Sequence, residues 1–174
     1  MGGLLNYVLT NFDLPTNARI LGETLAGNRG TITSSDFTQE ERDILRKLID
    51  YKMGQTNKQE DSVNYTDYIR FAKATNNEPK HWKWTGAEPG LSDIFHPLDR
   101  LKTTLGQFKY KKINNEIEVF DNYDFNKSGT TSISSLENYG LNDILGAGPY
   151  GMIRQYAGEH IPPGSGRKVY LKLK

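Results

Sequence analysis

The first third of the chain carries apolar residues at helical spacing. The segment TQEERDILRKLIDYKM, residues 38–53, places its apolar side chains on one stripe: Ile44, Leu45, Leu48, Ile49 and Met53. Thr38 and Glu41 fit a capping box, in which each side chain satisfies a backbone amide at the helix start. The pattern predicts an amphipathic helix over 38–53 that ends at Gly54.

Weaker patterns extend the helical part in both directions. Residues 17–25 predict one more helix, and NYTDYIRFAKAT, residues 64–75, predicts a short amphipathic one. The polar stretch QTNKQEDSVN, residues 55–64, predicts a linker or loop. NNEPKHWKWTGAEPG, residues 76–90, combines two prolines, two glycines and two tryptophans, which predicts a long irregular segment.

The last third of the chain changes to a period of two. In QFKYKKI, residues 107–113, aromatic side chains alternate with lysines, and EIEVFDNYDF, residues 116–125, follows after Asn114 and Asn115. Two strand-like runs separated by two turn-forming residues predict a β-hairpin. RKVYLKLK, residues 167–174, predicts a third strand, because its apolar residues again fall on one face.

Helices therefore precede strands along the chain. This order predicts an α+β fold, with a helical N-terminal part followed by a small open antiparallel β-sheet. The boundaries that follow are a helical lead-in at 1–60, a helix and irregular linker at 61–105, and a β-rich region at 106–174.

Charge and composition narrow the function classes. The 22 basic and 21 acidic residues leave a formal net charge of +1, so no bulk field draws the protein to nucleic acid or to an anionic membrane. HWKW, residues 81–84, and KYKK, residues 109–112, lie far apart in the sequence, and we expect no nucleic-acid binding from them. Cysteine is absent, which excludes disulfides, thiolate zinc sites and cysteine nucleophiles.

Membrane and export signals are not expected either. No apolar run approaches the roughly 20 residues of a membrane-spanning helix. The N-terminal MGGLLNYVL lacks the basic stretch and the small-residue cleavage site of a signal peptide.

A carboxylate interrupts the apolar face of the second predicted strand. Alternation places five side chains on that face: Ile117, Val119, Asp121, Tyr123 and Phe125. A buried carboxylate is costly unless it finds a cation, a metal ion or several hydrogen-bond donors. Together with Asp124, Asp121 therefore predicts either a divalent-metal site or a carboxyl group that works as a general acid or base.

Two other interpretations of these residues stay open. In the first, Asp121 caps the end of the strand and Asp124 starts an Asx turn before Asn126. In the second, DFNKSGT, residues 124–130, forms the first half of a calcium loop, with oxygen ligands followed by glycine at the sixth place. The second half departs from that pattern, because Ser135 stands at the twelfth place, where glutamate is usual.

Asp121, Tyr123 and Asp124 spell D-x-Y-D at the end of this strand. The motif resembles the signature of the colicin M family, toxins that cut lipid II, the undecaprenyl-linked peptidoglycan precursor, between the prenyl chain and the pyrophosphate. These toxins need a divalent metal, usually magnesium. Their catalytic part joins a helical region to an open, half-barrel-like β-structure, and the resemblance implies that fold here.

A wider set of segments is similar to parts of bacteriophage virion proteins. The segments are TTLGQFKY (103–110), VFDNYDFN (119–126), YGMIRQYAG (150–158) and IPPGSGRKV (161–169). The resemblance thus covers about residues 100–174.

The colicin M resemblance implies roles for individual residues. Asp121 is the lead catalytic carboxylate, Tyr123 orients it or donates to it, and Asp124 assists. Asp121 and Asp124 are then the ligands of magnesium. Arg154 is the candidate phosphate clamp, with Arg167 as the second candidate in sequence.

One departure from the family separates two functions. In the toxins a His-Arg pair follows D-x-Y-D closely, whereas FNKSGTTSIS, residues 125–134, contains neither residue. This favours an inactive colicin M-like domain in a bacteriophage virion-associated protein, structural or ejected, that contacts other virion proteins. The alternative is an active, metal-dependent lipid II hydrolase of the bacteriocin or effector type, which acts in the bacterial periplasm. A calcium-stabilised binding module is a third hypothesis.

Overall fold

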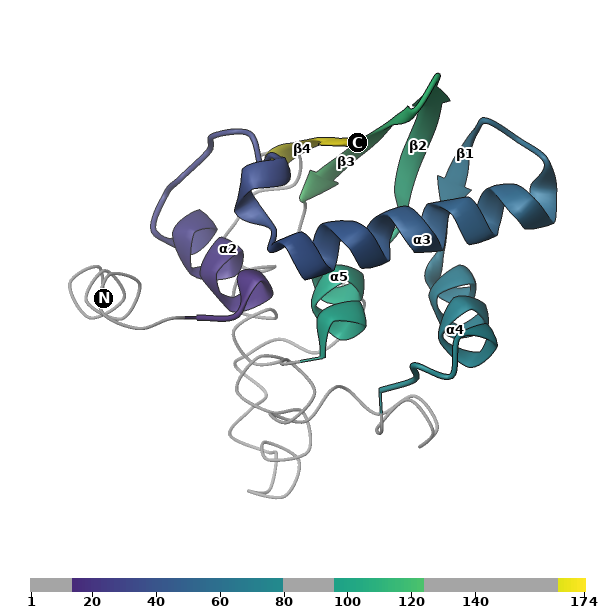
Figure 1. Ribbon diagram of the computed structural model, residues 1–174. Helices are drawn as coiled ribbons and strands as arrows, with labels where there is room; N and C mark the ends of the chain where they lie inside the picture. Colours follow the sequence, from purple (N-terminus) through teal and green to yellow (C-terminus); the bar gives the residue numbers. More distant parts are fainter. Residues whose placement is uncertain (1–13, 80–95, 124–165) are drawn as a thin grey trace, which may run out of the picture.

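The computed structural model describes residues 14–79, 96–123 and 166–174. These residues form α2 (Thr16–Leu25), the 3-10 turn η1 (Ser34–Asp36), α3 (Gln39–Thr56), β1 (Glu60–Val63), α4 (Tyr65–Ala74), α5 (Pro97–Leu105), β2 (Phe108–Ile113), β3 (Glu116–Tyr123) and β4 (Arg167–Leu173). The fold is α+β with an open four-stranded antiparallel sheet, and most helices precede the strands, as the sequence predicts. In Figure 1, α3 runs across the helical side of the sheet, with α2 and α4 on either side of α5.

The sheet has the strand order β1-β2-β3-β4, and every neighbouring pair is antiparallel. Ile113 lies opposite Glu116, so the predicted hairpin is confirmed, with a two-residue turn between its strands. Ile32 forms an isolated parallel bridge with Val169 of β4. Its backbone N–H donates to the carbonyl of Lys168 at 2.8 Å, which covers part of the outer edge of β4.

The capping box predicted for α3 is present, but the predicted helix end is wrong. The Glu41 N–H donates to Oγ1 of Thr38 at 3.2 Å, and the Thr38 N–H donates to the Glu41 carboxylate at 2.9 Å. The helix continues past Gly54 to Thr56 and stops where Asn57 adopts a left-handed conformation, with φ 53°. A glycine inside a helix lowers its stability without breaking it, so the stop signal is the asparagine.

Besides the short turn η1, one strand and one helix were not predicted from the sequence. Residues 60–63, inside the stretch predicted as a linker or loop, form the edge strand β1, in which only Val63 is buried. An edge strand of three polar residues and one valine lacks the alternation that reveals a strand. Helix α5 begins after His96, whose Nδ1 accepts the Leu98 N–H at 3.2 Å, and Pro97 occupies its first turn.

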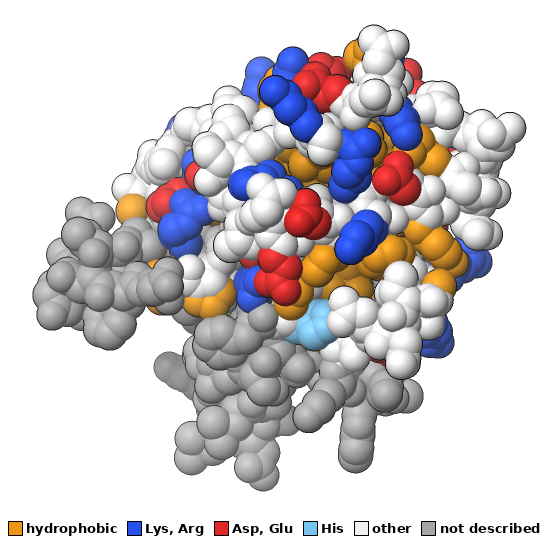
Figure 2. All heavy atoms as spheres, viewed as in Figure 1, with side chains coloured by type: hydrophobic (Ala, Val, Ile, Leu, Met, Phe, Trp, Pro, Cys, Tyr) orange, Lys and Arg blue, Asp and Glu red, His pale blue; other side chains and the backbone are white. Residues whose placement is uncertain are grey.

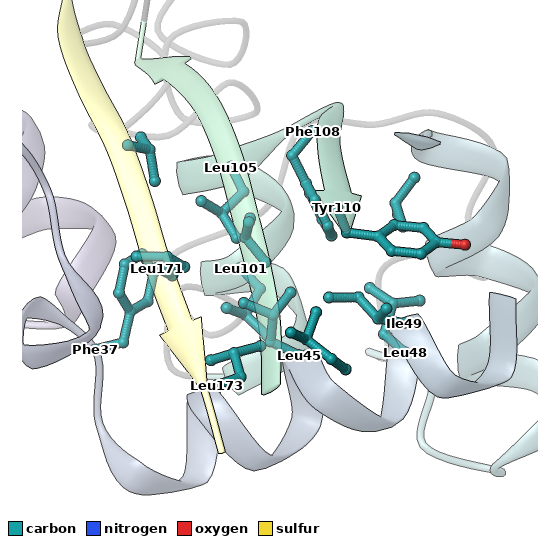
Figure 3. Packing of buried hydrophobic residues seen from close by; sticks show 14 of the residues in the cluster. Phe37, Leu45, Leu48, Ile49, Leu101, Leu105, Phe108, Tyr110, Leu171 and Leu173 are labelled. Carbon is teal, nitrogen blue, oxygen red and sulfur yellow. The ribbon is translucent and has the colours of Figure 1, made fainter. Parts of the chain in front are cut away.

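One hydrophobic core joins all parts of the described chain. The cluster extends from Ile20 of α2 to Leu173 of β4 and includes residues from each of the three described ranges of the chain. Figure 3 shows side chains of α3, α5 and the strands meeting between the helices and the sheet: Leu45, Leu48, Ile49, Leu101, Leu105, Phe108, Tyr110, Leu171 and Leu173. No helix within the described residues is long and apolar enough to cross a membrane.

Candidate functional site

The two faces of β3 are divided as the alternation predicts. Ile117 and Val119 are fully buried and Tyr123 is 5% exposed, whereas Asn122 on the other face is exposed. Asp121 belongs to the buried face, where it is half-buried. A carboxylate thus takes a place that the strand otherwise fills with core residues, and it is partly withdrawn from water there.

Asp121 lies within the strand ladder and not at its end. It is opposite Val169 of β4, and the pairing continues to Tyr123 opposite Arg167. The interpretation of Asp121 as a strand-end cap is therefore wrong. Asp124, and with it the Asx turn and the calcium-loop hypothesis, lies outside the described residues.

Arg167 is brought beside the D-x-Y-D motif by the β3–β4 register. It lies opposite Tyr123 on the inward face of the sheet and is only 3% exposed. Its guanidinium turns toward the end of α2, where Nε–H donates to the carbonyl of Gly30 at 2.8 Å and Nη1 lies 3.0 Å from Oε2 of Glu23. The charge of Arg167 thus holds the last strand against the region after α2. Arg154, the first candidate for a phosphate clamp, lies outside the described residues.

Tyr68 of α4 also lies near Asp121, although no sequence pattern marks it as a functional residue. Its side chain is fully buried and its ring contacts Phe108 edge to face, with centroids 6.4 Å apart. Burial raises the pKa of Tyr68 well above its usual value, and the nearby charge of Asp121 raises this pKa further. Its hydroxyl has no hydrogen-bond partner among the described residues. In the sequence Tyr68 looks like an ordinary member of an amphipathic helix, so only the fold reveals its proximity to Asp121.

The metal site remains a hypothesis based on two carboxylates. Within the described part of the chain, no group of three or more histidine, aspartate or glutamate side chains is placed to hold a metal ion. Asp121 is the one proposed ligand whose position is described. An open hollow lies at the opposite end of the sheet, at the hairpin turn, and is lined by Ile113, Asn114, Asn115, Glu116 and Lys174. It is separate from Asp121, which lies five residues along β3, or about 16 Å.

Charges of both signs mix on the helical side of the molecule. Figure 2 shows lysine and arginine side chains interspersed with aspartate and glutamate over the face on which α3 lies. The described residues of this face therefore form no broad surface of one sign.

Comparison with known proteins does not assign the chain to a family. No protein-family model, no curated protein and no solved structure matches the chain.

Proposed function

We propose that the chain is a bacteriophage virion-associated protein whose C-terminal part carries a colicin M-like domain in a structural, catalytically inactive form. The D-x-Y-D motif and the wider similarity to virion segments support this proposal. The observation that supports an inactive domain is the set of partners that the Arg167 guanidinium binds. Its guanidinium is bound by Glu23 and by the carbonyl of Gly30, so it stabilises the fold instead of facing a phosphate group. A cation committed in this way does not supply the charge stabilisation that cleavage at a pyrophosphate requires.

An active lipid II hydrolase is the second candidate, and the position of Asp121 favours it. Asp121 is held half-buried on the inward face, next to Tyr123 along the motif and within electrostatic range of Tyr68. A strand selected for packing alone would carry an apolar residue there. A carboxylate in such a position is therefore a candidate functional group.

In the hydrolase hypothesis, Asp121 is suited to be a ligand of magnesium. Magnesium binds through one or two carboxylates together with phosphate oxygens of the substrate. Asp121 is such a carboxylate and is fixed in the ladder opposite Val169. The bound metal would polarise the pyrophosphate oxygens, and the contribution of this chain would be to hold Asp121 at a set position on a rigid strand.

Incubation of the full chain with lipid II and magnesium separates the two candidates. The inactive domain releases no undecaprenol at any magnesium, manganese or calcium concentration. The enzyme releases it, and Asp121→Asn then lowers the rate about 100-fold or more. Asn122→Ala is the matched control, because Asn122 is the neighbouring residue on the exposed face.

The virion part of the proposal has its own test. Particles of the phage that encodes the chain are purified by density, and their proteins are identified by mass spectrometry. The chain is expected at a reproducible copy number per particle. Its absence from intact particles, with the protein present in infected cells, contradicts a virion role whatever the lipid II assay gives.

A further inference from the structure

The outer face of the sheet, opposite the helices, presents an aromatic pair. Phe120 of β3 and Tyr170 of β4 lie opposite each other in register, with ring centroids 5.3 Å apart and ring planes inclined by 35°. Phe120 is 40% exposed, although it stands on an inner strand of the sheet. Tyr170 is half-buried and its hydroxyl donates to Glu118 at 2.6 Å, so the pair forms a small aromatic platform in which the Phe120 ring is the part open to solvent.

Two exposed lysines border this platform. Lys109 of β2 lies opposite Phe120, and Lys168 of β4 lies opposite Asn122, one outward position further along β3. Both lysines are exposed, and neither forms an ion pair with a described residue. Because β3 separates them by two strand spacings, they stand on either side of the Phe120 ring, about 10 Å apart across the sheet.

Two other outward lysines of the strands, Lys111 and Lys172, lie near carboxylates. Nζ of Lys111 lies 3.7 Å from Glu60, and Nζ of Lys172 lies 3.4 Å from Glu116 and 3.8 Å from Glu118. Lys109 and Lys168 are therefore the outward lysines of β2 and β4 that no described carboxylate pairs, and both lie near the aromatic pair.

The sequence predicts no nucleic-acid binding from KYKK, residues 109–112, but the sheet places Lys109 of that segment beside Phe120, and we propose that this surface binds single-stranded nucleic acid. Exposed aromatic rings on a sheet stack on unpaired bases, and lysines beside them contact the phosphates. A duplex keeps its base faces stacked inside, so it would use the lysines but not the rings. An acidic peptide would likewise use the lysines alone. Lys109 and Lys168 lie about 60 residues apart in the sequence, and the strand order β2-β3-β4 brings them to either side of Phe120. The inference is independent of Asp121, which points to the opposite face.

Fluorescence anisotropy of labelled oligothymidylate with the full chain tests the proposal. Saturable binding is expected at about 50 mM salt and should weaken as salt rises. Phe120→Leu should weaken binding at least about fivefold, whereas Phe120→Tyr, which keeps a ring, should retain it. Lys109→Gln and Lys168→Gln should each reduce the slope of log affinity against log salt by about 0.7.

Lys47→Gln is the matched control for charge. Lys47 is exposed on α3, on the other side of the sheet, and this substitution changes the net charge by the same amount. Absence of saturable binding overturns the proposal, and so does equal weakening by Lys47→Gln. If polyglutamate competes fully and Phe120→Leu has no effect, the surface binds acidic protein and not nucleic acid. Should Phe120→Leu fail to fold, the salt slopes of the two lysine variants decide the question.

Discussion

Arg167 lies opposite Tyr123 in the β3–β4 ladder, yet its guanidinium binds Glu23 and the carbonyl of Gly30 at the end of α2. The side chain of Arg167 is 4% exposed, and that of Glu23 is 25% exposed. A charge that is almost fully buried depends on such partners for its stability. This pairing therefore joins the last strand of the chain to its first described helix.

Replacement of Arg167 by methionine is expected to lower the free energy of unfolding by about 1–3 kcal/mol. The Gly30 carbonyl loses a donor, while Glu23 keeps its ion pair with Arg19 at 2.7 Å, which limits the loss. Urea unfolding of the full chain measures the change. Lys168→Met is the control, because Lys168 is adjacent and exposed. It should change stability by no more than about 0.5 kcal/mol, and equal effects of the two variants would contradict the assigned role.

Glu41 is the second buried charge that holds elements together. It is fully buried and accepts hydrogen bonds from Oγ1 of Thr16 at 2.8 Å and from Nε of Arg100 at 2.5 Å, besides its capping role. Glu41→Gln should destabilise the protein by about 3 kcal/mol or more, because Arg100 loses its buried counter-charge. Glu40→Gln is the matched control, since Glu40 is 65% exposed and 3.6 Å from the same arginine. Chemical unfolding should show a loss below about 1 kcal/mol for this control.

Glu41 also illustrates how far the sequence predicts the fold. Its capping partner Thr38 is three residues away, so a local pattern reveals it. Its partners Thr16 and Arg100 lie 25 and 59 residues away, and no local pattern encodes them. The hairpin and β4 were predictable for the same local reason, because alternation and turn residues are read over a few positions. Strand β1 was not, because its pairing with β2 and not its own composition makes it a strand.

The candidate site, too, is predictable only where a local pattern determines it. Alternation alone places Asp121 and Tyr123 on the inward face, and the burial along β3 agrees. The neighbours of these residues come from β4 and α4, which lie far from β3 in the chain. The resemblance names Arg167 as a candidate, but its position opposite Tyr123 comes from strand register, and the proximity of Tyr68 to Asp121 comes only from helix packing.

Two substitutions at the end of α3 test where this helix stops. Gly54 lies inside the helix, and a Cβ added there meets no atom within 4 Å. Gly54→Ala should therefore raise stability by about 0.5–1 kcal/mol, because glycine loses more backbone entropy on folding. Asn57 has φ 53°, so Asn57→Ala should lower stability by about 1 kcal/mol, whereas Asn57→Gly should not. Thermal unfolding measures all three variants. A loss of stability in Gly54→Ala would move the helix end back to the position that the sequence predicts.

Tyr68 offers a test of the buried hydroxyl near Asp121. Because the hydroxyl has no partner among the described residues, Tyr68→Phe should leave the stability at pH 7 unchanged or raise it by up to about 1 kcal/mol. A loss of more than about 1 kcal/mol in urea unfolding would mean that the hydroxyl is bonded in solution. Tyr110→Phe is a suitable comparison, since the Tyr110 hydroxyl donates to the carbonyl of Lys58 at 3.3 Å. This second variant should be the less stable of the two.

Tyr68→Phe should also change how the stability of the protein depends on pH in the alkaline range. Burial, together with the charge of Asp121, raises the pKa of Tyr68 in the folded state above the value of about 10 expected for an unfolded chain. Above that pH the unfolded chain releases the proton while the folded protein keeps it, so stability should fall as pH rises past about 10. Burial also raises the pKa of Tyr110, and the hydrogen bond to Glu118 raises that of Tyr170, so the wild-type slope has several sources. The urea midpoints of the wild type and of Tyr68→Phe, measured from about pH 8 to pH 11, should therefore diverge above about pH 10, and the midpoint of the wild type should fall more steeply. Parallel curves would show that the proton of Tyr68 is not linked to folding.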